Sequence, residues 1–251
     1  MRVVLAGAAS AVGQAVTALL VARGARVAGI DLHPGQGQVE RAVVADLRDA
    51  VTAGRAVDEA VAALGGVDAA VLGLAVQRGG RLDETTQETW EQVMGGTLDA
   101  TAHTLRRLVA VMGSGSSVVA ISSVNASLAH PGNAAYAAAK GAVNALLRQA
   151  AVEYAPRGIR LNVVAPGLID DRSASPLTAG YPMGRVVTTR EVAEVVAFLA
   201  SPASSGVTGA VIPVDAGLSA TSPVAFARES MYRAWQAGAS GMSLGRSDQA
   251  D

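Results

Sequence analysis

The chain has 251 residues, of which 50% are hydrophobic and 16% are charged, and its 20 basic and 21 acidic residues give a net charge of −1. This composition excludes a largely disordered chain, and the lack of a basic run argues against nucleic acid as a partner. The absence of cysteine excludes disulfides, thiolate metal sites and cysteine nucleophiles, and it fits a cytoplasmic protein.

Short apolar runs alternate with helical patterns along residues 1–218. The runs predict buried strands at Val3–Ala6, Arg26–Ile30, Ala42–Ala45, Ala69–Leu74, Ser117–Ile121, Ile159–Val164 and Ala210–Val214. The stretches between them predict helices at Ala11–Arg23, Ala50–Leu64, Gln87–Met112, Ala135–Tyr154 and Arg190–Ala200. Repeated strand–helix–strand units favour one α/β domain with a doubly wound, seven-stranded parallel sheet and helices on both faces. No apolar run reaches the ~18 residues of a membrane span, so we expect no membrane partner.

Residues 219–251 form a C-terminal extension of different character. After a break at Ser219–Pro223, the segment Val224–Ala237 mixes large apolar and charged residues, which predicts an amphipathic helix. A polar tail follows from Gly238. The apolar residues of this helix could cover a neighbouring subunit, close an active site, or pack against their own domain.

The first strand runs into a glycine-rich turn, Gly7-Ala8-Ala9-Ser10-Ala11-Val12-Gly13, and then a helix. Such a turn suits a pyrophosphate, because backbone N–H groups and the helix dipole face the anion. Asp31 ends the second strand about 20 residues further on, where a carboxylate can bind the hydroxyls of an adenosine ribose. Taken separately, the glycines also fit an ordinary strand–helix turn, and Asp31 a solvated loop residue.

Asp31 also bears on the choice between the two nicotinamide cofactors. A 2′-phosphate beside it would place like charges close together, at a cost of up to ~4 kcal/mol for ~4 Å and an effective dielectric of ~20. No Lys or Arg follows in Leu32-His33-Pro34-Gly35 to offset that cost. The sequence therefore favours NAD(H) over NADP(H).

Tyr136 and Lys140 are four residues apart in a predicted helix, so they share one face. A tyrosine is a poor acid–base group near neutral pH unless a nearby ammonium stabilises its phenolate. Ser123 lies thirteen residues upstream, after a predicted strand, where its hydroxyl can hold a substrate oxygen. Alone, the Tyr–Lys spacing is a chance pattern; with Ser123 and the glycine-rich turn it indicates proton-transfer chemistry.

From Arg2 to Leu218 the chain strongly resembles the short-chain dehydrogenase/reductase family. The resemblance rests on motifs in family order, namely the glycine-rich turn, Asp31, Ala45-Asp46-Leu47, Trp90, Ile121-Ser122-Ser123, Tyr136-Ala137-Ala138-Ala139-Lys140, Arg160–Gly167, Val207-Thr208-Gly209 and Val214-Asp215-Ala216-Gly217. It implies a Rossmann fold and hydride transfer between a nicotinamide and a carbonyl or alcohol carbon. It also implies a homo-oligomer, a tetramer or a dimer, built through the long helices Gln87–Met112 and Ala135–Tyr154.

The same resemblance assigns roles to individual residues. Ser123 would orient the substrate oxygen, Tyr136 would be the acid–base residue, and Lys140 would hold the nicotinamide ribose and tune Tyr136. Thr97 falls where the family has a helix asparagine that holds a water in the proton relay, and its hydroxyl could do so. The cofactor would contact Gly7, Ser10, Ala11, Val12, Gly13, Asp31, Asp46, Leu47, Ala75, Tyr136, Lys140, Pro166, Gly167 and Ile169.

Several positions depart from the family pattern. Ala11 replaces a turn glycine, Gly73-Leu74-Ala75-Val76 replaces Asn-Asn-Ala-Gly, Asp171 replaces a threonine, and Ala216 replaces a glycine. Gly95 and Gly96 beside Thr97 weaken the helix by ~1 kcal/mol each relative to Ala and favour a local kink. These departures leave open an alternative, a member of the fold that performs non-redox acid–base chemistry (an isomerase, cyclase or eliminase of secondary metabolism). A third reading is a non-catalytic binding or scaffold subunit, against which the intact Ser–Tyr–Lys set argues.

Leu168–Arg185 is the segment in which the family keeps its substrate lid. It carries Leu168, Ile169, Leu177, Tyr181 and Met183, while Val124, Leu128 and Pro131 are candidates for the facing wall. These side chains predict a hydrophobic, cyclic alcohol or ketone as substrate, although they would equally pack the loop itself. His33, His103 and His130 are scattered, so no metal site is expected; His130 is read as an exposed loop residue or a substrate contact.

Overall fold

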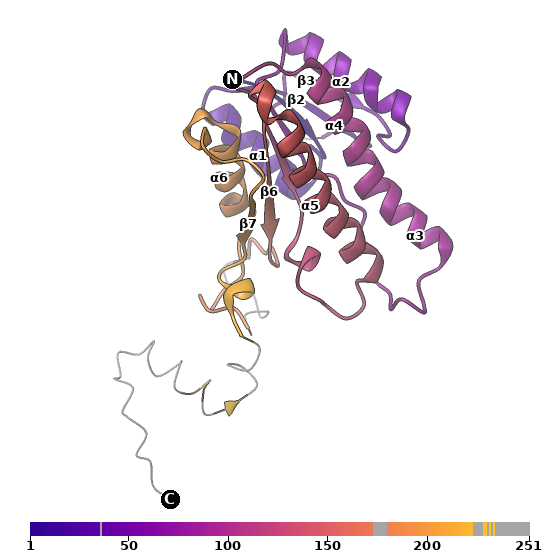
Figure 1. The fold of residues 1–251 in the computed structure, drawn as a ribbon, viewed down its shortest axis with the longest axis vertical. Coiled ribbons are helices and arrows are strands. Elements are labelled where there is room, and N and C mark those ends of the chain that lie inside the picture. The colour runs from indigo at the N-terminus through magenta and orange to yellow at the C-terminus, as the bar shows by residue number, and fades with distance from the viewer. Residues whose placement is uncertain (36, 173–179, 223–227, 230, 232, 234–251) are drawn as a thin grey trace, which may run out of the picture.

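The computed structural model describes residues 1–35, 37–172, 180–222, 228, 229, 231 and 233 (Figure 1). Its strands are β1 (Arg2–Ala6), β2 (Arg26–Asp31), β3 (Arg41–Val44), β4 (Ala69–Leu72), β5 (Ser117–Ile121), β6 (Arg160–Pro166) and β7 (Val211–Val214). They form one parallel sheet in the order β3-β2-β1-β4-β5-β6-β7. The expected seven-stranded, doubly wound sheet is therefore confirmed, with strand ends shifted by up to two residues.

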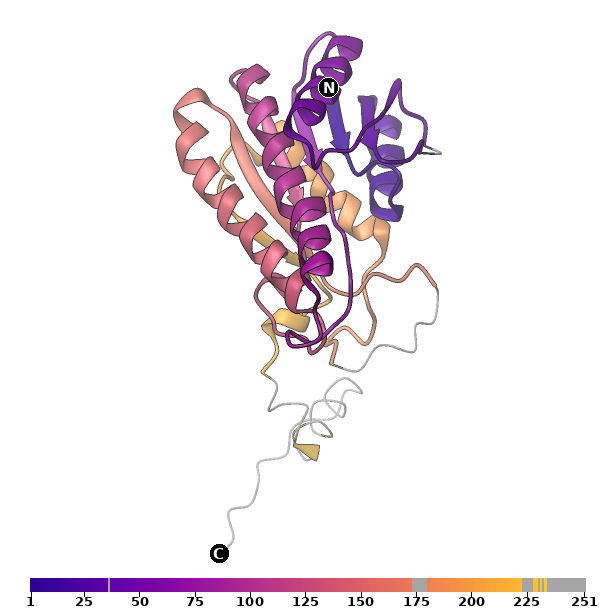
Figure 2. The ribbon, with the colours of Figure 1, turned by 90° about the vertical axis from the view of Figure 1, so that its right-hand side faces the viewer.

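Helices cover both faces of this sheet (Figures 1 and 2). They are α1 (Ala11–Ala22), α2 (Ala50–Leu64), α3 (Gln87–Met94), α4 (Ala100–Val111), α5 (Ala134–Tyr154) and α6 (Thr189–Ala200). One apolar cluster joins the sheet to α2, α4 and α5, and a second joins it to α1 and α6. The two layers account for the lack of alternation in the strand sequences, since both faces of each central strand are buried.

Strand β1 illustrates this double burial. Val3 and Leu5 belong to the cluster with α1 and α6, whereas Val4 and Ala6 belong to the cluster on the opposite face. All four side chains are fully buried, as the two-residue period of a strand between helical layers requires.

The helix expected over Gln87–Met112 is interrupted. A π-helical turn, η1 (Gly95–Asp99), separates α3 from α4, so the expectation of one regular helix is corrected. Gly96 lies in this turn, and a Cβ atom there would lie 2.3 Å from Cγ2 of Val76, so a side chain at this position would have to displace Val76. The kink anticipated from Gly95 and Gly96 thus takes the form of a single widened turn.

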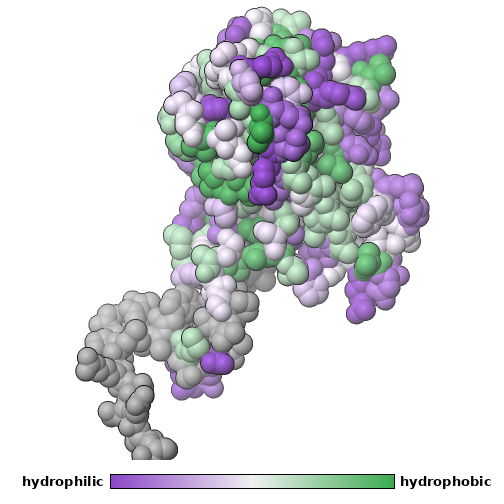
Figure 3. Space-filling model, in the orientation of Figure 1, coloured by the Kyte–Doolittle hydropathy of each residue, from purple (hydrophilic) through white to green (hydrophobic). Residues whose placement is uncertain are grey.

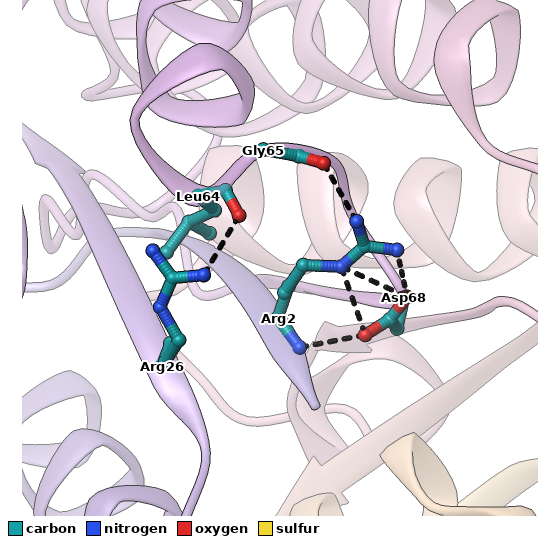
Figure 4. Close-up of polar contacts among 5 residues, drawn as sticks. All are labelled: Arg2, Arg26, Leu64, Gly65 and Asp68. Carbon is teal, nitrogen blue, oxygen red and sulfur yellow. Dashed lines mark hydrogen bonds and ion pairs between the residues drawn. The ribbon is translucent and has the colours of Figure 1, made fainter.

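An arginine network holds the amino ends of the strands together (Figure 4). The backbone and side chain of Arg2 donate to the Asp68 carboxylate, and its Nη1 donates to the Gly65 carbonyl at 2.7 Å. Arg26 Nη1 donates to the Leu64 carbonyl at 3.0 Å. These bonds join β1 and β2 to the turn between α2 and β4, at the end of the sheet opposite the carboxyl ends, where open α/β sheets bind their ligands.

The segment after β7 reaches a short 3₁₀ turn, η5 (Leu218–Ala220). The predicted helix over Val224–Ala237 and the polar tail fall almost entirely outside the described residues. Among the helices that the structure describes, none is both long and apolar enough to cross a membrane. Within the same residues, no three His, Asp or Glu side chains gather in a way that could hold a metal ion.

Candidate functional site

Two adjoining cavities lie at the carboxyl ends of the strands. The smaller has a volume of about 600 Å³, and its lining residues lie between Gly7 and Ala100 in the sequence. The larger has a volume of about 900 Å³, and its lining residues lie between Ser10 and Leu218. Both are lined by Ser10, Gly73 and Ala75, so they meet at the glycine-rich turn. An elongated ligand can therefore extend from one cavity into the other across the start of α1.

The glycine-rich turn is held by close backbone packing. A Cβ on Gly7 would lie 2.5 Å from the Gly73 carbonyl oxygen, and one on Gly13 would lie 2.2 Å from that of Gly7. Ser10 caps α1: its hydroxyl accepts the Gly13 N–H at 3.0 Å and donates to the Gly7 carbonyl at 2.8 Å. Ala11 opens the helix and is exposed, so its extra methyl group lies at the outer surface of the turn. Val12 lines the larger cavity.

Asp31 lines the smaller cavity and is tied to the turn. Its Oδ2 accepts the Ala9 N–H at 2.9 Å, and its Oδ1 accepts that of His33 at 3.3 Å. The carboxylate therefore links the end of β2 to the glycine-rich turn while facing the cavity. Asp46 and Leu47 line the same cavity, as the sequence predicts.

Two arginines that the sequence did not predict, Arg48 and Arg78, also line this cavity. Arg48 makes a two-pronged contact with Asp46, with Nε–Oδ distances of 3.0 Å and an Nη2–Oδ2 distance of 2.5 Å. This hydrogen bond lowers the pKa of the Asp46 carboxyl and holds both charges in place. The one available signal for Arg48 was its position two residues after Asp46. Arg78 follows the irregular Gly73–Val76 segment and carried no signal.

Ser123, Tyr136 and Lys140 all line the larger cavity. Ser123 follows β5 and begins a 3₁₀ turn, where its hydroxyl accepts the Asn125 N–H at 3.1 Å. Tyr136 and Lys140 lie one turn apart in α5, as their spacing predicts. Burial raises the pKa of Tyr136, while a side-chain hydrogen bond with Ser123 acts in the opposite direction.

Lys140 is almost fully buried and binds two backbone carbonyls. Its Nζ donates to Ile121 O at 2.8 Å and to Leu74 O at 3.1 Å, and it lies 5.8 Å from the centre of the Tyr136 ring. Desolvation lowers the pKa of the ammonium to about 7. The structure thus departs from the expectation that Lys140 lowers the pKa of Tyr136: burial dominates both groups and raises that of Tyr136.

Thr97 lies in the π-helical turn and is fully buried, outside the lining of both cavities. Its hydroxyl oxygen accepts the Val76 N–H at 3.0 Å. The expectation that this hydroxyl holds a water stays a prediction. The hydroxyl fixes the backbone of the Gly73–Val76 segment. Together with the Lys140–Leu74 bond, it substitutes for the polar side chains that this segment lacks.

The walls of the larger cavity are mainly apolar. Val124, Pro166, Gly167, Leu168, Ile169 and Tyr181 line it as expected, and Leu218 joins them. Met183 is 61% exposed, and neither Leu128 nor Pro131 is among the lining residues, so their expected roles in the wall are not supported. Leu177 lies outside the described residues.

Asp171 and a set of polar side chains complete the surroundings. The Asp171 carboxylate accepts the backbone N–H of Thr189 at 2.8 Å and its hydroxyl at 3.0 Å, which ties the segment after β6 to the start of α6. Gln77, Asn125, His130 and Asn133 line the larger cavity; of these, the sequence singled out only His130.

Comparison with known proteins agrees with this geometry. A family model described as Enoyl-(Acyl carrier protein) reductase matches residues 7–219. The cis-4-hydroxycyclohexanecarboxylate dehydrogenase of Sinomonas cyclohexanicum is 36% identical over 86% of this chain and 96% of its own length. An uncharacterized NAD-dependent oxidoreductase of Mycobacterium tuberculosis is 33% identical over 84% and 93%. The crystal structure of levodione reductase superposes with a TM-score of 0.82 at 27% identity, over 88% of this chain and 98% of that one.

Proposed function

The chain belongs to the short-chain dehydrogenase/reductase family and is an oxidoreductase of that type, and from this premise we propose that it interconverts a secondary alcohol and a ketone on a hydrophobic, cyclic small molecule with NAD(H). One observation carries the proposal. Ser123, Tyr136 and Lys140 line a single apolar-walled cavity that meets the Asp31 cavity at the glycine-rich turn. Such an arrangement suits a redox cofactor and an alcohol bound side by side.

The residues present fit a nicotinamide dinucleotide. The two cavities suit its two halves, and their junction at Ser10 and the start of α1 suits the pyrophosphate between them. When bound, the nicotinamide would accept or supply the hydride. Asp31, Asp46 and Leu47 would hold the adenosine half, and Tyr136, Lys140, Pro166, Gly167 and Ile169 the nicotinamide half, with Gly7, Val12 and Ala75 along the path.

NAD(H) is favoured over NADP(H) by the charge at the adenosine half. Asp31 keeps its carboxylate at the cavity, where a 2′-phosphate would be repelled. Two arginines line this cavity: Arg48 is already paired with Asp46, and the Arg78 guanidinium donates to the Gln77 carbonyl at 3.1 Å. The Mycobacterium relative, whose name specifies NAD dependence, points in the same direction.

In this chemistry Tyr136 moves the proton and Ser123 holds the substrate oxygen. The Ser123 hydroxyl hydrogen-bonds the substrate oxygen, which keeps that oxygen beside the Tyr136 hydroxyl. In reduction, the Tyr136 hydroxyl donates its proton to the carbonyl oxygen. In oxidation, the ionised form of Tyr136, which burial makes the minor form near neutral pH, removes the alcohol proton. Lys140 presents one N–H beyond the two that bind Ile121 and Leu74, and this N–H suits a ribose hydroxyl. The apolar lining, Val124, Leu168, Ile169, Tyr181 and Leu218, encloses the hydrocarbon part.

A turnover assay tests the proposal. The purified chain is incubated with NAD⁺ and a series of saturated cyclic alcohols that includes 4-hydroxycyclohexanecarboxylate, the compound that the name of the 36% identical relative specifies. The growth of the absorbance band of reduced nicotinamide reports turnover. Substrate consumption without that band would favour the alternative of non-redox acid–base chemistry.

The proposal extends to location and assembly. The chain has no cysteine, which suits a reducing cytoplasm. The exposed surface over α5 is mainly pale green to white in hydropathy, as its alanine-rich sequence predicts (Figure 3). A weakly apolar helical face of this kind suits the homotetramer or dimer inferred from the family resemblance.

A further inference from the structure

The larger cavity has polar lining residues that the reaction of an apolar alcohol does not use. Gln77, Asn125, His130 and Asn133 are among them; we call these four residues the polar group of the cavity. The side-chain amides of Gln77 and Asn125 have no hydrogen-bond partner among the described residues. Three amides and an imidazole besides Ser123, Tyr136 and Lys140 indicate a ligand with a second polar group.

His130 and Asn133 are held against each other by the loop that carries them. Nδ1 of His130 lies 2.9 Å from the Pro131 carbonyl oxygen and 3.1 Å from Nδ2 of Asn133. This loop is in turn bound to the facing one, since Gly80 donates its N–H to the Gly132 carbonyl at 2.8 Å. Because the loop occupies Nδ1, the other ring nitrogen, Nε2, is the one left for a ligand, together with the second N–H of the Asn133 amide.

The charges around the cavity select the kind of group that would bind. No Asp or Glu is among the described residues that line it, so nothing there repels an anion. A carboxylate accepts hydrogen bonds only, and bonds from amide and imidazole N–H groups to a charged acceptor are the stronger kind. A neutral hydroxyl would gain less from the same donors.

We propose that His130 and Asn133, with Asn125, bind a carboxylate that the substrate carries in addition to the reacting hydroxyl. The inference rests on the proposed function, because it is Ser123 and Tyr136 that would hold the reacting hydroxyl. It assigns substrate selection to the polar group and catalysis to Ser123 and Tyr136 in the same cavity.

Paired substrates test this assignment. For the wild type, kcat/KM for 4-hydroxycyclohexanecarboxylate is expected to exceed that for 4-methylcyclohexanol by about tenfold or more, the effect of one charge-assisted hydrogen bond. His130→Ala and Asn133→Ala should each remove about tenfold from kcat/KM for the hydroxy acid, through KM rather than kcat. Both variants should keep kcat/KM for 4-methylcyclohexanol within about twofold of the wild-type value. Ser127→Ala, an exposed position of the same loop that does not line the cavity, is the matched control.

Equal kcat/KM values for the two alcohols in the wild type would overturn the carboxylate site and leave the proposed function standing. The methyl ester of the hydroxy acid separates charge from hydrogen bonding: an ester used as well as the acid would also overturn it. Binding of unreactive cyclohexanecarboxylate, measured by NMR titration, decides the matter independently of turnover. Affinity that falls in His130→Ala and Asn133→Ala supports the site, and unchanged affinity in both contradicts it.

Discussion

Nζ of Lys140 donates a hydrogen bond to the carbonyl oxygen of Leu74, 66 residues away in the sequence, at 3.1 Å. With the Thr97–Val76 bond, it fixes a segment, Gly73–Val76, that separates the two cavities and has no polar side chain of its own. Lys140 of α5 therefore has a structural partner in the segment between the two cavities. Its backbone partners are neutral, so no opposite charge offsets the loss of hydration that lowers its pKa to about 7.

The titration of Lys140 can be observed directly, because it is the only lysine in the chain. In protein labelled with ¹³C at lysine Cε, one signal should titrate with a midpoint near 7. In the unfolded chain Lys140 keeps its proton up to a pH of about 10.5, so between about pH 7 and 10.5 the unfolded chain binds more protons than the folded chain. The free energy of unfolding should therefore rise with pH across that window, by at most about 1.4 kcal/mol per pH unit. Lys140→Met should lack this rise; a midpoint near 10.5 would refute the desolvation argument.

Tyr136→Phe should abolish proton transfer without removing much packing. Turnover is expected to fall by roughly 10²- to 10⁴-fold, the usual contribution of a positioned acid–base group. Affinity for NAD⁺, followed by thermal melting, should change little. Tyr154→Phe, at the far end of α5, is the matched control and should keep full activity. A Tyr136→Phe variant with near-normal turnover would remove Tyr136 from the mechanism.

Thr97→Val replaces a hydroxyl by a methyl group of the same shape. It leaves the Val76 N–H without its acceptor, so the free energy of unfolding should fall by about 1–3 kcal/mol. Thr97→Ser keeps the hydroxyl oxygen, so its free energy of unfolding should fall clearly less than that of Thr97→Val. Urea unfolding of the three proteins measures the difference, and equal losses in both variants would show that the hydrogen bond contributes nothing.

Ala216→Gly should stabilise the chain. Ala216 has a φ of +52°, the only positive φ of a non-glycine residue among those described, and the left-handed region costs an alanine about 1–2 kcal/mol. The greater freedom of glycine in the unfolded chain removes about 0.4–1 kcal/mol of that gain. A net rise of roughly 0.5–1 kcal/mol corresponds to a Tm higher by about 1–4 °C.

The neighbouring position provides the reciprocal test. Gly217→Ala, at φ +89° and with its Cβ 3.1 Å from Cγ of Pro182, should lower Tm. A lower Tm for Ala216→Gly as well would mean that strain at Ala216 is not what limits stability in this turn.

Much of the site could be predicted because periodicity and sheet topology determine it. Parallel strands bring their carboxyl ends to one edge, so the glycine-rich turn, Asp31 and Ser123 had to lie near one another. Helical spacing then places Tyr136 and Lys140 on one face of α5. These arguments need only the order of the elements and the position of each residue within its element.

What escaped prediction depends on backbone atoms that are distant in sequence. The carbonyls of Leu74 and Ile121 that bind Lys140 carry no side-chain signature, and neither does the Val76 N–H that occupies Thr97. Arg48 reaches Asp46 across two positions, a contact that composition does not reveal. The direction of the Tyr136 pKa shift was likewise expected from charge alone, whereas burial decides it.

The most direct test of the account is a thermal-melt titration of the purified chain with NAD⁺, NADH, NADP⁺ and NADPH, alongside an Asp31→Ser variant. A ligand at 100 times its dissociation constant adds about 2.7 kcal/mol to the stability of the folded chain. We predict a rise in Tm with NAD⁺ and NADH alone, and a response to NADP⁺ and NADPH that appears in Asp31→Ser. A wild type that responds to none of the four, or more strongly to NADP(H), would contradict an NAD(H)-dependent dehydrogenase.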